Sequence, residues 1–214
     1  MLKIILKGHD NYYGVADVIR AFWHHPAEDH DNGCVTCDEA PDSVLISEAL
    51  ANSTKCYSTD GKISIELDAV TVPFACGREV KRSVYLALAE LSGRRAPWGC
   101  LTGIRPTLVA GEEKDAQLLA ERYFVRPDKA ELALATYNNE KMILEGLPEN
   151  DINIYVGIPF CPSRCEYCSF ISSDIHHHMG RLKSYLEALE GEIKACGPHI
   201  KRNISTLYIG GGTP

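Results

Sequence analysis

The sequence predicts an α/β chain in which a small α+β domain, a helical connector and one β-loop-α-β unit follow one another. Three observations support this order. Strand and helix patterns mix over residues 1–93, and two helical stretches follow a Gly- and Pro-rich segment within 94–150. A strand, a cysteine-bearing loop, a helix and a second strand then occupy 151–214. We take these three ranges as the predicted domains.

The first domain is expected to combine four strands with two helices. Strand patterns cover 2–6, 43–47, 54–57 and the alternating Ile63, Ile65 and Leu67, and Asp60-Gly61 is a typical hairpin turn. Apolar residues at helical spacing predict helices over 12–23 and 77–91, the second closed by Gly93. The polar segment 24–42, which contains Pro and Gly, is expected to be a loop.

The connector is expected to be irregular over residues 98–110 and helical after that. Helices are predicted over 115–124 and 129–145, and Pro127 lies at the start of the second, where a missing amide proton is tolerated. Gly146, Pro148 and Asn150 then break the helical pattern.

The last segment has the pattern of a parallel sheet. Strands are predicted over 152–158 and 206–209, with an amphipathic helix over 182–193 between them. Such a crossover joins parallel strands, and α/β folds place their active sites at the carboxyl ends of those strands. A cysteine-bearing loop follows the first strand and a glycine run follows the second, so we expect both at that edge.

Composition and charge exclude several classes of function. The net charge is -7: residues 1–150 hold 16 Lys and Arg against 23 Asp and Glu, and residues 151–214 hold six of each. No basic stripe with interleaved aromatic residues is present, so nucleic-acid binding is not expected. We find neither an apolar stretch long enough for a membrane span nor a signal peptide, and we expect a cytoplasmic protein.

Cys161, Cys165 and Cys168 form a C-x3-C-x2-C motif in the loop after the strand at 152–158. Three thiolates on a tight loop can bind three irons of a [4Fe–4S] cluster, whereas a cluster held only by protein usually takes four cysteines. The fourth iron is then open to an exogenous ligand. Zinc is the alternative, with a fourth ligand from the histidines at 176–178, but zinc prefers paired C-x2-C knuckles.

The glycine run is Gly210-Gly211-Gly212-Thr213-Pro214. Glycines let the backbone approach a ligand closely and expose its amides, so a carboxylate or an amino group could be held there. A plain tight turn is the simpler interpretation of such a run taken alone. Its position one β-α-β unit after the cysteine loop favours ligand binding.

Together the motifs resemble the start of a radical S-adenosylmethionine (radical SAM) domain of the oxygen-independent coproporphyrinogen III oxidase group. Tyr155, the run 158–161, Cys165-x-Tyr167-Cys168 and the run 210–214 carry the resemblance. Residues 8–10 and 97–107 are similar to the HemZ-type coproporphyrinogen dehydrogenases, so the resemblance extends over nearly the whole chain. It implies a partial TIM-like barrel, of which 151–214 would form the first β-loop-α-β unit.

The resemblance also implies cofactors, partners and a reaction. The implied site consists of the cluster ligands Cys161, Cys165 and Cys168, the S-adenosylmethionine contacts Tyr155 and Tyr167, and the residues lining its methionine end, Gly211, Gly212 and Thr213. The implied oxidoreductase reaction of haem and porphyrin biosynthesis converts two propionates of coproporphyrinogen III to vinyls by oxidative decarboxylation. A 5′-deoxyadenosyl radical would take a hydrogen from a propionate β-carbon. The partners would be the porphyrinogen and an electron donor such as flavodoxin or ferredoxin.

Two departures from the oxidase pattern keep other functions open. Gly157 stands where the oxidases have His, and Phe170 stands where they have a fourth cysteine. Related proteins without that cysteine include haem chaperones that lack oxidase activity, and a different radical SAM reaction is a third option. A barrel of this kind needs on the order of 200 residues, so we expect an N-terminal fragment of a longer protein that is inactive alone.

The other cysteines, three histidines and one arginine are weaker candidates. Cys34 and Cys37, which follow three histidines, could bind zinc but are expected to be free thiols in a loop. Cys56, Cys76 and Cys196 are expected to be small buried hydrophobic residues, and Cys100 has no ligand partner in the pattern. The histidines at 176–178 are expected in an exposed loop, and Arg105 could equally face substrate carboxylates or brace a loop.

Overall fold

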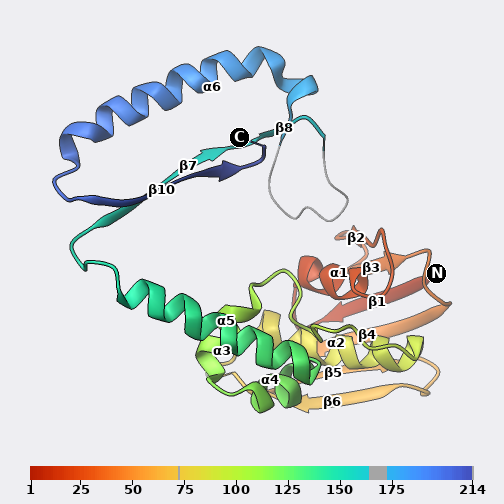
Figure 1. The fold of residues 1–214 in the computed structure, drawn as a ribbon. Helices are drawn as coiled ribbons and strands as arrows, with labels where there is room; N and C mark the ends of the chain where they lie inside the picture. The colour runs from red at the N-terminus through yellow and green to blue at the C-terminus, as the bar shows by residue number, and fades with distance from the viewer. Residues whose placement is uncertain (72, 164–172, 214) are drawn as a thin grey trace. The chain divides into compact units, whose positions relative to one another are not determined.

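The computed structural model describes residues 1–71, 73–163 and 173–213, except for the side chain of His177. These residues divide into two compact units, Met1–Glu140 and Lys141–Pro214, and each is described by itself (Figure 1). The chain is mixed α/β, as the sequence predicts, and the described residues form no closed barrel. The three predicted domain limits stay a prediction.

A six-stranded sheet with the order β2-β3-β1-β4-β5-β6 forms the base of the first unit. Its strands are β1 (Leu2–Lys7), β2 (Ala27–Asp29), β3 (Cys34–Cys37), β4 (Ser43–Ala49), β5 (Ser53–Ser58) and β6 (Ser64–Asp68). β1 and β4 are parallel and all other neighbours in this sheet are antiparallel. The turn predicted at Asp60-Gly61 joins β5 to β6, with Gly61 at a φ of 75°.

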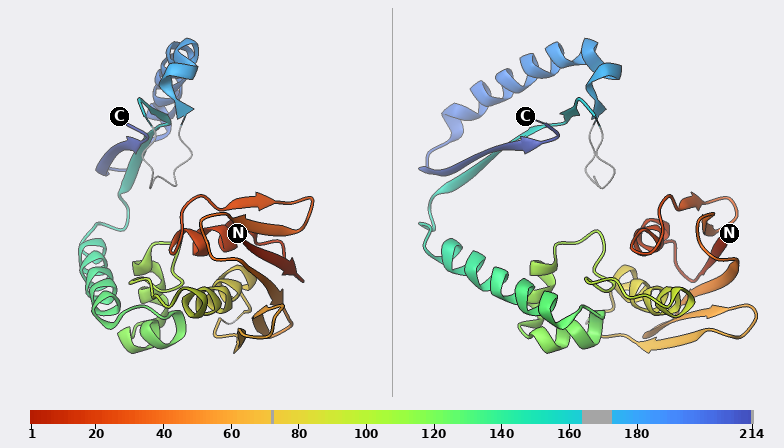
Figure 2. Two further views of the ribbon diagram at one scale, coloured as in Figure 1. Left: turned by 90° about the vertical axis from the view of Figure 1, so that its right-hand side faces the viewer. Right: turned by 45° about the vertical axis from the view of Figure 1, so that its right-hand side comes forward.

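Helices α1 (Tyr12–Arg20) and α2 (Cys76–Ser92) contact each other and pack against this sheet (Figures 1 and 2). The strands alternate in burial, so that Leu2, Ile4 and Leu45 face the helices while Lys3 and Val44 do not. Each fully buried aliphatic side chain stabilises the fold by about 1.5–3 kcal/mol. Gly93 closes α2 in the left-handed conformation, as the sequence predicts.

Two predictions about irregular segments are wrong. Segment 24–42 is not a loop, because β2 and β3 form within it and β3 pairs with β1 in the middle of the sheet. The segment is polar as a whole, but Cys34–Cys37 within it includes the β-branched Val35 and Thr36, and pairing with β1 makes these residues a strand. Segment 98–110 was predicted to be irregular throughout, but helix α3 (Pro106–Glu113) begins inside it. Pro106 lies in the first turn of this helix, where the backbone amide that proline lacks would have no partner within the helix.

Helices α4 (Ala116–Tyr123) and α5 (Pro127–Glu145) follow α3, close to their predicted ranges. The chain before them is fixed by backbone hydrogen bonds from Cys100 N to Tyr123 O and from Arg126 N to Pro97 O, both 3.0 Å. Gly99 has a φ of 57°, and a Cβ there would collide with the carbonyls of Tyr123 and Phe124. The segment 97–100 therefore depends on glycine at position 99.

The second unit contains the predicted crossover. Its elements are β7 (Ile152–Ile158), β8 (Phe160–Cys161), β9 (Ser173–Asp174), α6 (Ile175–Cys196), a 3-10 turn (Gly197–His199) and β10 (Ile204–Gly211). β7 and β10 are parallel, and Figure 1 shows α6 running along this strand pair. The histidines at 176–178 lie in the first turns of α6 rather than in a loop, because Asp174 caps the helix before them by accepting from His176 N (2.8 Å).

A buried ion pair joins α2 to the rest of the first unit. Glu79 accepts from Arg82 Nη1 (2.6 Å), Thr71 Oγ1 (2.6 Å) and Thr71 N (2.7 Å), and Arg82 also donates to the carbonyls of Asp68 and Arg122. Burial alone would raise the pKa of Glu79, but the hydrogen bonds from Thr71 and Arg82 outweigh it and hold the pKa below its usual value. The charged carboxylate is thus the form that fits the fold.

The substitution Glu79→Gln is expected to lower the free energy of unfolding by about 3–5 kcal/mol, because Arg82 is left as a buried charge without its counterion. Urea unfolding followed by circular dichroism measures this, with the exposed Glu90→Gln on the same helix as control. The stability that the lowered pKa provides is complete above pH 4.5 and is lost as the pH falls through the folded pKa. The variant should lack this acid-dependent loss, and unchanged stability at neutral pH would contradict the assignment.

Candidate functional site

The candidate site lies where β7 and β10 end. The two strands pair in register, with Tyr155 opposite Tyr208 and Gly157 opposite Gly210. Beyond the strands, Gly212 N donates to Ile158 O (2.5 Å) and Thr213 N donates to Phe160 O (2.8 Å). The start of the cysteine loop and the glycine run therefore lie side by side at the carboxyl ends of two parallel strands, as the sequence predicts.

The glycine run passes against the cysteine loop too closely for side chains. Gly211 has a φ of 115°, and a Cβ at this position would lie 2.6 Å from the Ile158 carbonyl oxygen. A Cβ at Gly212 would lie 2.9 Å from the Cys161 sulfur and would collide with the Phe160 carbonyl. Both positions require glycine for reasons of space, and Gly211 also for its backbone conformation.

The amides of the run are less available than the sequence suggests. Gly212 N and Thr213 N donate to main-chain carbonyls, so neither is free to bind a carboxylate. The Gly212 carbonyl accepts no hydrogen bond from the backbone of the described residues. This edge therefore offers a hydrogen-bond acceptor, which suits an amino group better than a carboxylate.

Of the three cysteines in the motif, the structure describes Cys161. Its free thiol is half-buried on β8, which pairs with β9 through Phe160 opposite Ser173 and Cys161 opposite Asp174. Cys165, Tyr167 and Cys168 lie outside the described residues. Within the described part of the chain, no three His, Cys, Asp or Glu side chains come together as metal ligands.

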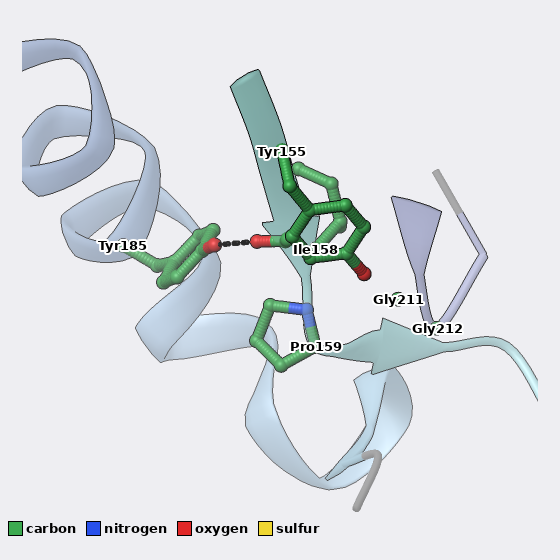
Figure 3. Close-up of a pocket in the computed structure, with 7 residues that line it drawn as sticks. Tyr155, Ile158, Pro159, Tyr185, Gly211 and Gly212 are labelled. Carbon is green, nitrogen blue, oxygen red and sulfur yellow. Dashed lines mark hydrogen bonds between the residues drawn. The ribbon is translucent and has the colours of Figure 1, made fainter. Parts of the chain in front are cut away.

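A cavity of about 320 Å³ opens beside this strand end (Figure 3). Its lining residues are Tyr155, Gly157, Ile158, Pro159, Tyr185, Gly211 and Gly212. Figure 3 shows the Tyr155 ring and the Tyr185 hydroxyl converging on the end of β7 from different elements. The volume is at the lower end of the range for small-molecule sites, about 300–1,000 Å³.

Tyr185 belongs to this site although the sequence motifs do not contain it. Its hydroxyl donates to the Gly157 carbonyl, and its ring meets the edge of the Phe160 ring at a centroid distance of 5.3 Å. The periodicity of 182–193 identifies its helix face but not the strand residue that it contacts. Tyr185 holds α6 against the backbone from which the cysteine loop departs.

The thiols outside the motif differ in burial. Cys56 and Cys100 are fully buried, and burial raises the pKa of each to about 12. Cys76 is half-buried with a raised pKa, for the same reason. Cys196 is exposed at the last position of α6, so its prediction as a buried residue is wrong.

The remaining candidates, Cys34, Cys37 and Arg105, lie in the first unit. Cys34 and Cys37 are both buried on β3, and residues three apart on a strand point to opposite faces, so this pair cannot chelate one ion. Arg105 is exposed, and the described residues provide no ion-pair partner for it. No helix in the described ranges is long and apolar enough to cross a membrane.

Comparisons with known proteins agree with the resemblance seen in the sequence. The chain is 32% identical over 145 residues to the oxygen-independent coproporphyrinogen-III oxidase-like protein HemZ of Bacillus subtilis, covering 61% of the chain and 29% of that protein. It is 36% identical over 81 residues to the oxygen-independent coproporphyrinogen III oxidase of Mannheimia haemolytica, covering 36% of the chain and 55% of that protein.

A third relative is named as a heme chaperone rather than as an oxidase. The heme chaperone HemW of Buchnera aphidicola is 35% identical over 66 residues, which covers 29% of the chain and 17% of that protein. No family model and no solved structure matches the chain. The curated proteins named HemZ and oxygen-independent coproporphyrinogen III oxidase are thus homologues over part of their length, and the chain spans 29% of the HemZ relative.

The substitution Tyr185→Phe tests the contact between α6 and the site. Loss of one hydrogen bond, about 1 kcal/mol net, should speed local opening and hydrogen exchange at the Gly212 and Thr213 amides about fivefold. Exchange followed by mass spectrometry or NMR measures this, with the exposed Tyr13→Phe as the matched control. Equal exchange rates in wild type and Tyr185→Phe would show that the hydroxyl does not hold the strand end.

Proposed function

We propose that the chain binds a [4Fe–4S] cluster and S-adenosylmethionine and forms part of a radical SAM enzyme that oxidatively decarboxylates coproporphyrinogen III. One observation carries this proposal: a Cβ at Gly212 would lie 2.9 Å from the Cys161 sulfur. A ligand held by the glycine run would therefore adjoin metal bound by the cysteine loop. The tetrapyrrole substrate is supported by the names of the HemZ and oxidase relatives.

The residues present fit this pair of cofactors. Three thiolates at C-x3-C-x2-C spacing suit three irons of a cubane cluster, with Cys161, Cys165 and Cys168 as the ligands. The Gly212 carbonyl suits the amino group of the methionine end, and Gly211 and Gly212 let this backbone approach the start of the cysteine loop. When bound, the cluster and S-adenosylmethionine supply an electron and a 5′-deoxyadenosyl radical able to take hydrogen from a propionate β-carbon.

The chain itself positions these groups. Tyr155 and Tyr185 line the cavity with aromatic rings, and Pro159 continues its apolar wall. Tyr167, outside the described residues, is the second tyrosine proposed to contact S-adenosylmethionine. The hydrogen bond from Tyr185 to Gly157 sets the strand end from which Cys161 departs. The electron donor is proposed to be a flavodoxin or ferredoxin.

A haem chaperone on the same scaffold is the second candidate. Phe170 stands at the position of the fourth oxidase cysteine, and a relative named heme chaperone HemW matches 29% of the chain. In that case the cluster and S-adenosylmethionine site would remain, and the protein would bind haem without consuming a porphyrinogen.

The substitution Gly212→Ala is expected to lower affinity for S-adenosylmethionine by about tenfold, because the new methyl group would displace Phe160 and Cys161. Iron and sulfide content after anaerobic reconstitution should fall as well. Equilibrium dialysis and metal analysis measure the two effects. The matched control is Gly191→Ala, whose Cβ would meet nothing within 4 Å and whose helix tolerates alanine better than glycine. Wild-type affinity in Gly212→Ala would refute the proposed contact.

The reaction is tested with the full open reading frame that encodes this chain. After reconstitution, it should consume coproporphyrinogen III and release 5′-deoxyadenosine and carbon dioxide, with products separated by chromatography. Stoichiometric haem binding without porphyrinogen consumption would favour the chaperone. Absence of both activities would exclude both candidates.

A further inference from the structure

The two faces of the β7–β10 pair differ in chemistry. One face carries the aliphatic side chains Ile154 and Val156, which are half-buried. The other carries polar and aromatic side chains in cross-strand pairs: Asn153 with Thr206, and Tyr155 with Tyr208. Thr206 Oγ1 donates to Asn153 Oδ1 (2.7 Å). Parallel strands covered by packed structure on both faces are usually aliphatic on both, so the second face has the composition of a binding surface.

The tyrosine pair is the largest feature of this face. The Tyr155 and Tyr208 rings are stacked at a centroid distance of 5.4 Å and an interplanar angle of 24°, and the side chains are 59% and 64% exposed. No sequence motif singles out Tyr208. It joins Tyr155 because the strands are paired in register.

Two glycines let these rings lean toward the strand ends. A Cβ at Gly210 would lie 2.6 Å from Tyr208 Cε1 and 3.2 Å from its hydroxyl, and a Cβ at Gly157 would lie 3.2 Å from Tyr155 Cε1. Each ring thus lies over the glycine two residues further along its strand. Tyr155 also lines the cavity, and Figure 3 shows its ring extending toward the carboxyl end of β7.

Neither phenol hydroxyl has a hydrogen-bond partner among the described residues, whereas the Tyr185 hydroxyl donates to Gly157. Tyrosines in a packed core normally satisfy their hydroxyls. Two exposed rings with available hydroxyl donors can offer both stacking surface and hydrogen bonds to a ligand.

We propose that Tyr208, supported by its stacking partner Tyr155, forms an aromatic ledge that binds the macrocycle of a carboxylate-bearing tetrapyrrole next to the glycine run. Tyr208 is thereby proposed as a substrate-binding residue. This inference rests on the proposed function. A pyrrole ring stacks on the face of Tyr208 that Tyr155 leaves uncovered, and the Tyr208 hydroxyl donates to a propionate carboxylate. Because the cavity holds only about 320 Å³, the macrocycle extends from it along the exposed face.

The test is a titration of the 214-residue chain with coproporphyrin III, a stable and coloured tetrapyrrole with four propionates, followed by the porphyrin absorption band. Tyr208→Leu removes the ring and is expected to weaken binding about three- to tenfold. Tyr208→Phe keeps the ring and should weaken it less. Tyr13→Leu replaces another exposed tyrosine, 55% exposed on α1, and should bind as wild type does.

A second variant moves the ring without removing it. Gly210→Ala forces the Tyr208 ring aside, and because the ring is the far end of a side chain, the backbone need not move. Weaker porphyrin binding with an unchanged circular dichroism spectrum would support the ledge. S-adenosylmethionine binding, measured in parallel by equilibrium dialysis, should change less than porphyrin binding in both variants.

Three results would overturn the inference. They are equal porphyrin affinity in wild type and Tyr208→Leu, no porphyrin binding by the wild-type chain over the micromolar range, and a loss confined to S-adenosylmethionine binding. The full open reading frame separates this failure from failure of the proposed function: continued coproporphyrinogen consumption by a Tyr208→Leu enzyme with unchanged KM refutes the ledge alone.

Discussion

Two backbone hydrogen bonds, from Gly212 to Ile158 and from Thr213 to Phe160, hold the candidate site together. They join the residues that follow two parallel strands, and they form only when α6 has brought β10 back beside β7. Parallel strands need such a long connection, so the site exists only once the whole crossover has folded. The requirement for glycine at 211 and 212 follows from this closeness, as does the position of the Cys161 sulfur beside the run.

Helix α2 has a comparable role in the first unit. Two residues far apart in sequence contact this helix: Asn11, directly after the HemZ-like residues 8–10, and Thr102, within the HemZ-like residues 97–107. Asn11 Nδ2 donates to Gly77 O (3.1 Å), and Lys81 Nζ donates to Thr102 O (2.8 Å). Burial lowers the pKa of Lys81, although Asp17 nearby favours its charge. A single helix therefore connects the sheet, α1 and the segment before α3.

The local sequence pattern predicted most of the helices and strands. It failed where strand pairing or packing determines the structure of a segment. The helix ended by Gly93 and the turn at Asp60-Gly61 carry their own signals, and both are found. β3 has only four residues within a polar segment, and its pairing with β1 makes it a strand. The parallel crossover was enough to predict that the cysteine loop and the glycine run lie side by side. The contact of Tyr185 with Gly157 depends on the position of α6, and the pairing of Tyr208 with Tyr155 depends on the strand register, and no pattern in a single sequence specifies either. The roles of Cys165, Tyr167 and Cys168 stay predictions.

The burial of Cys56 and Cys100 has a consequence for thiol chemistry. Iron ions, oxidants and alkylating reagents all react with thiolates, and a thiol with a pKa of about 12 is almost wholly protonated at neutral pH. Burial therefore prevents Cys56 and Cys100 from competing with Cys161 for iron while a metal centre is assembled. Cys196, at the end of α6, is exposed to solvent rather than buried. Among the cysteines that the structure describes, it is the one most open in air to disulfide formation between two copies of the chain.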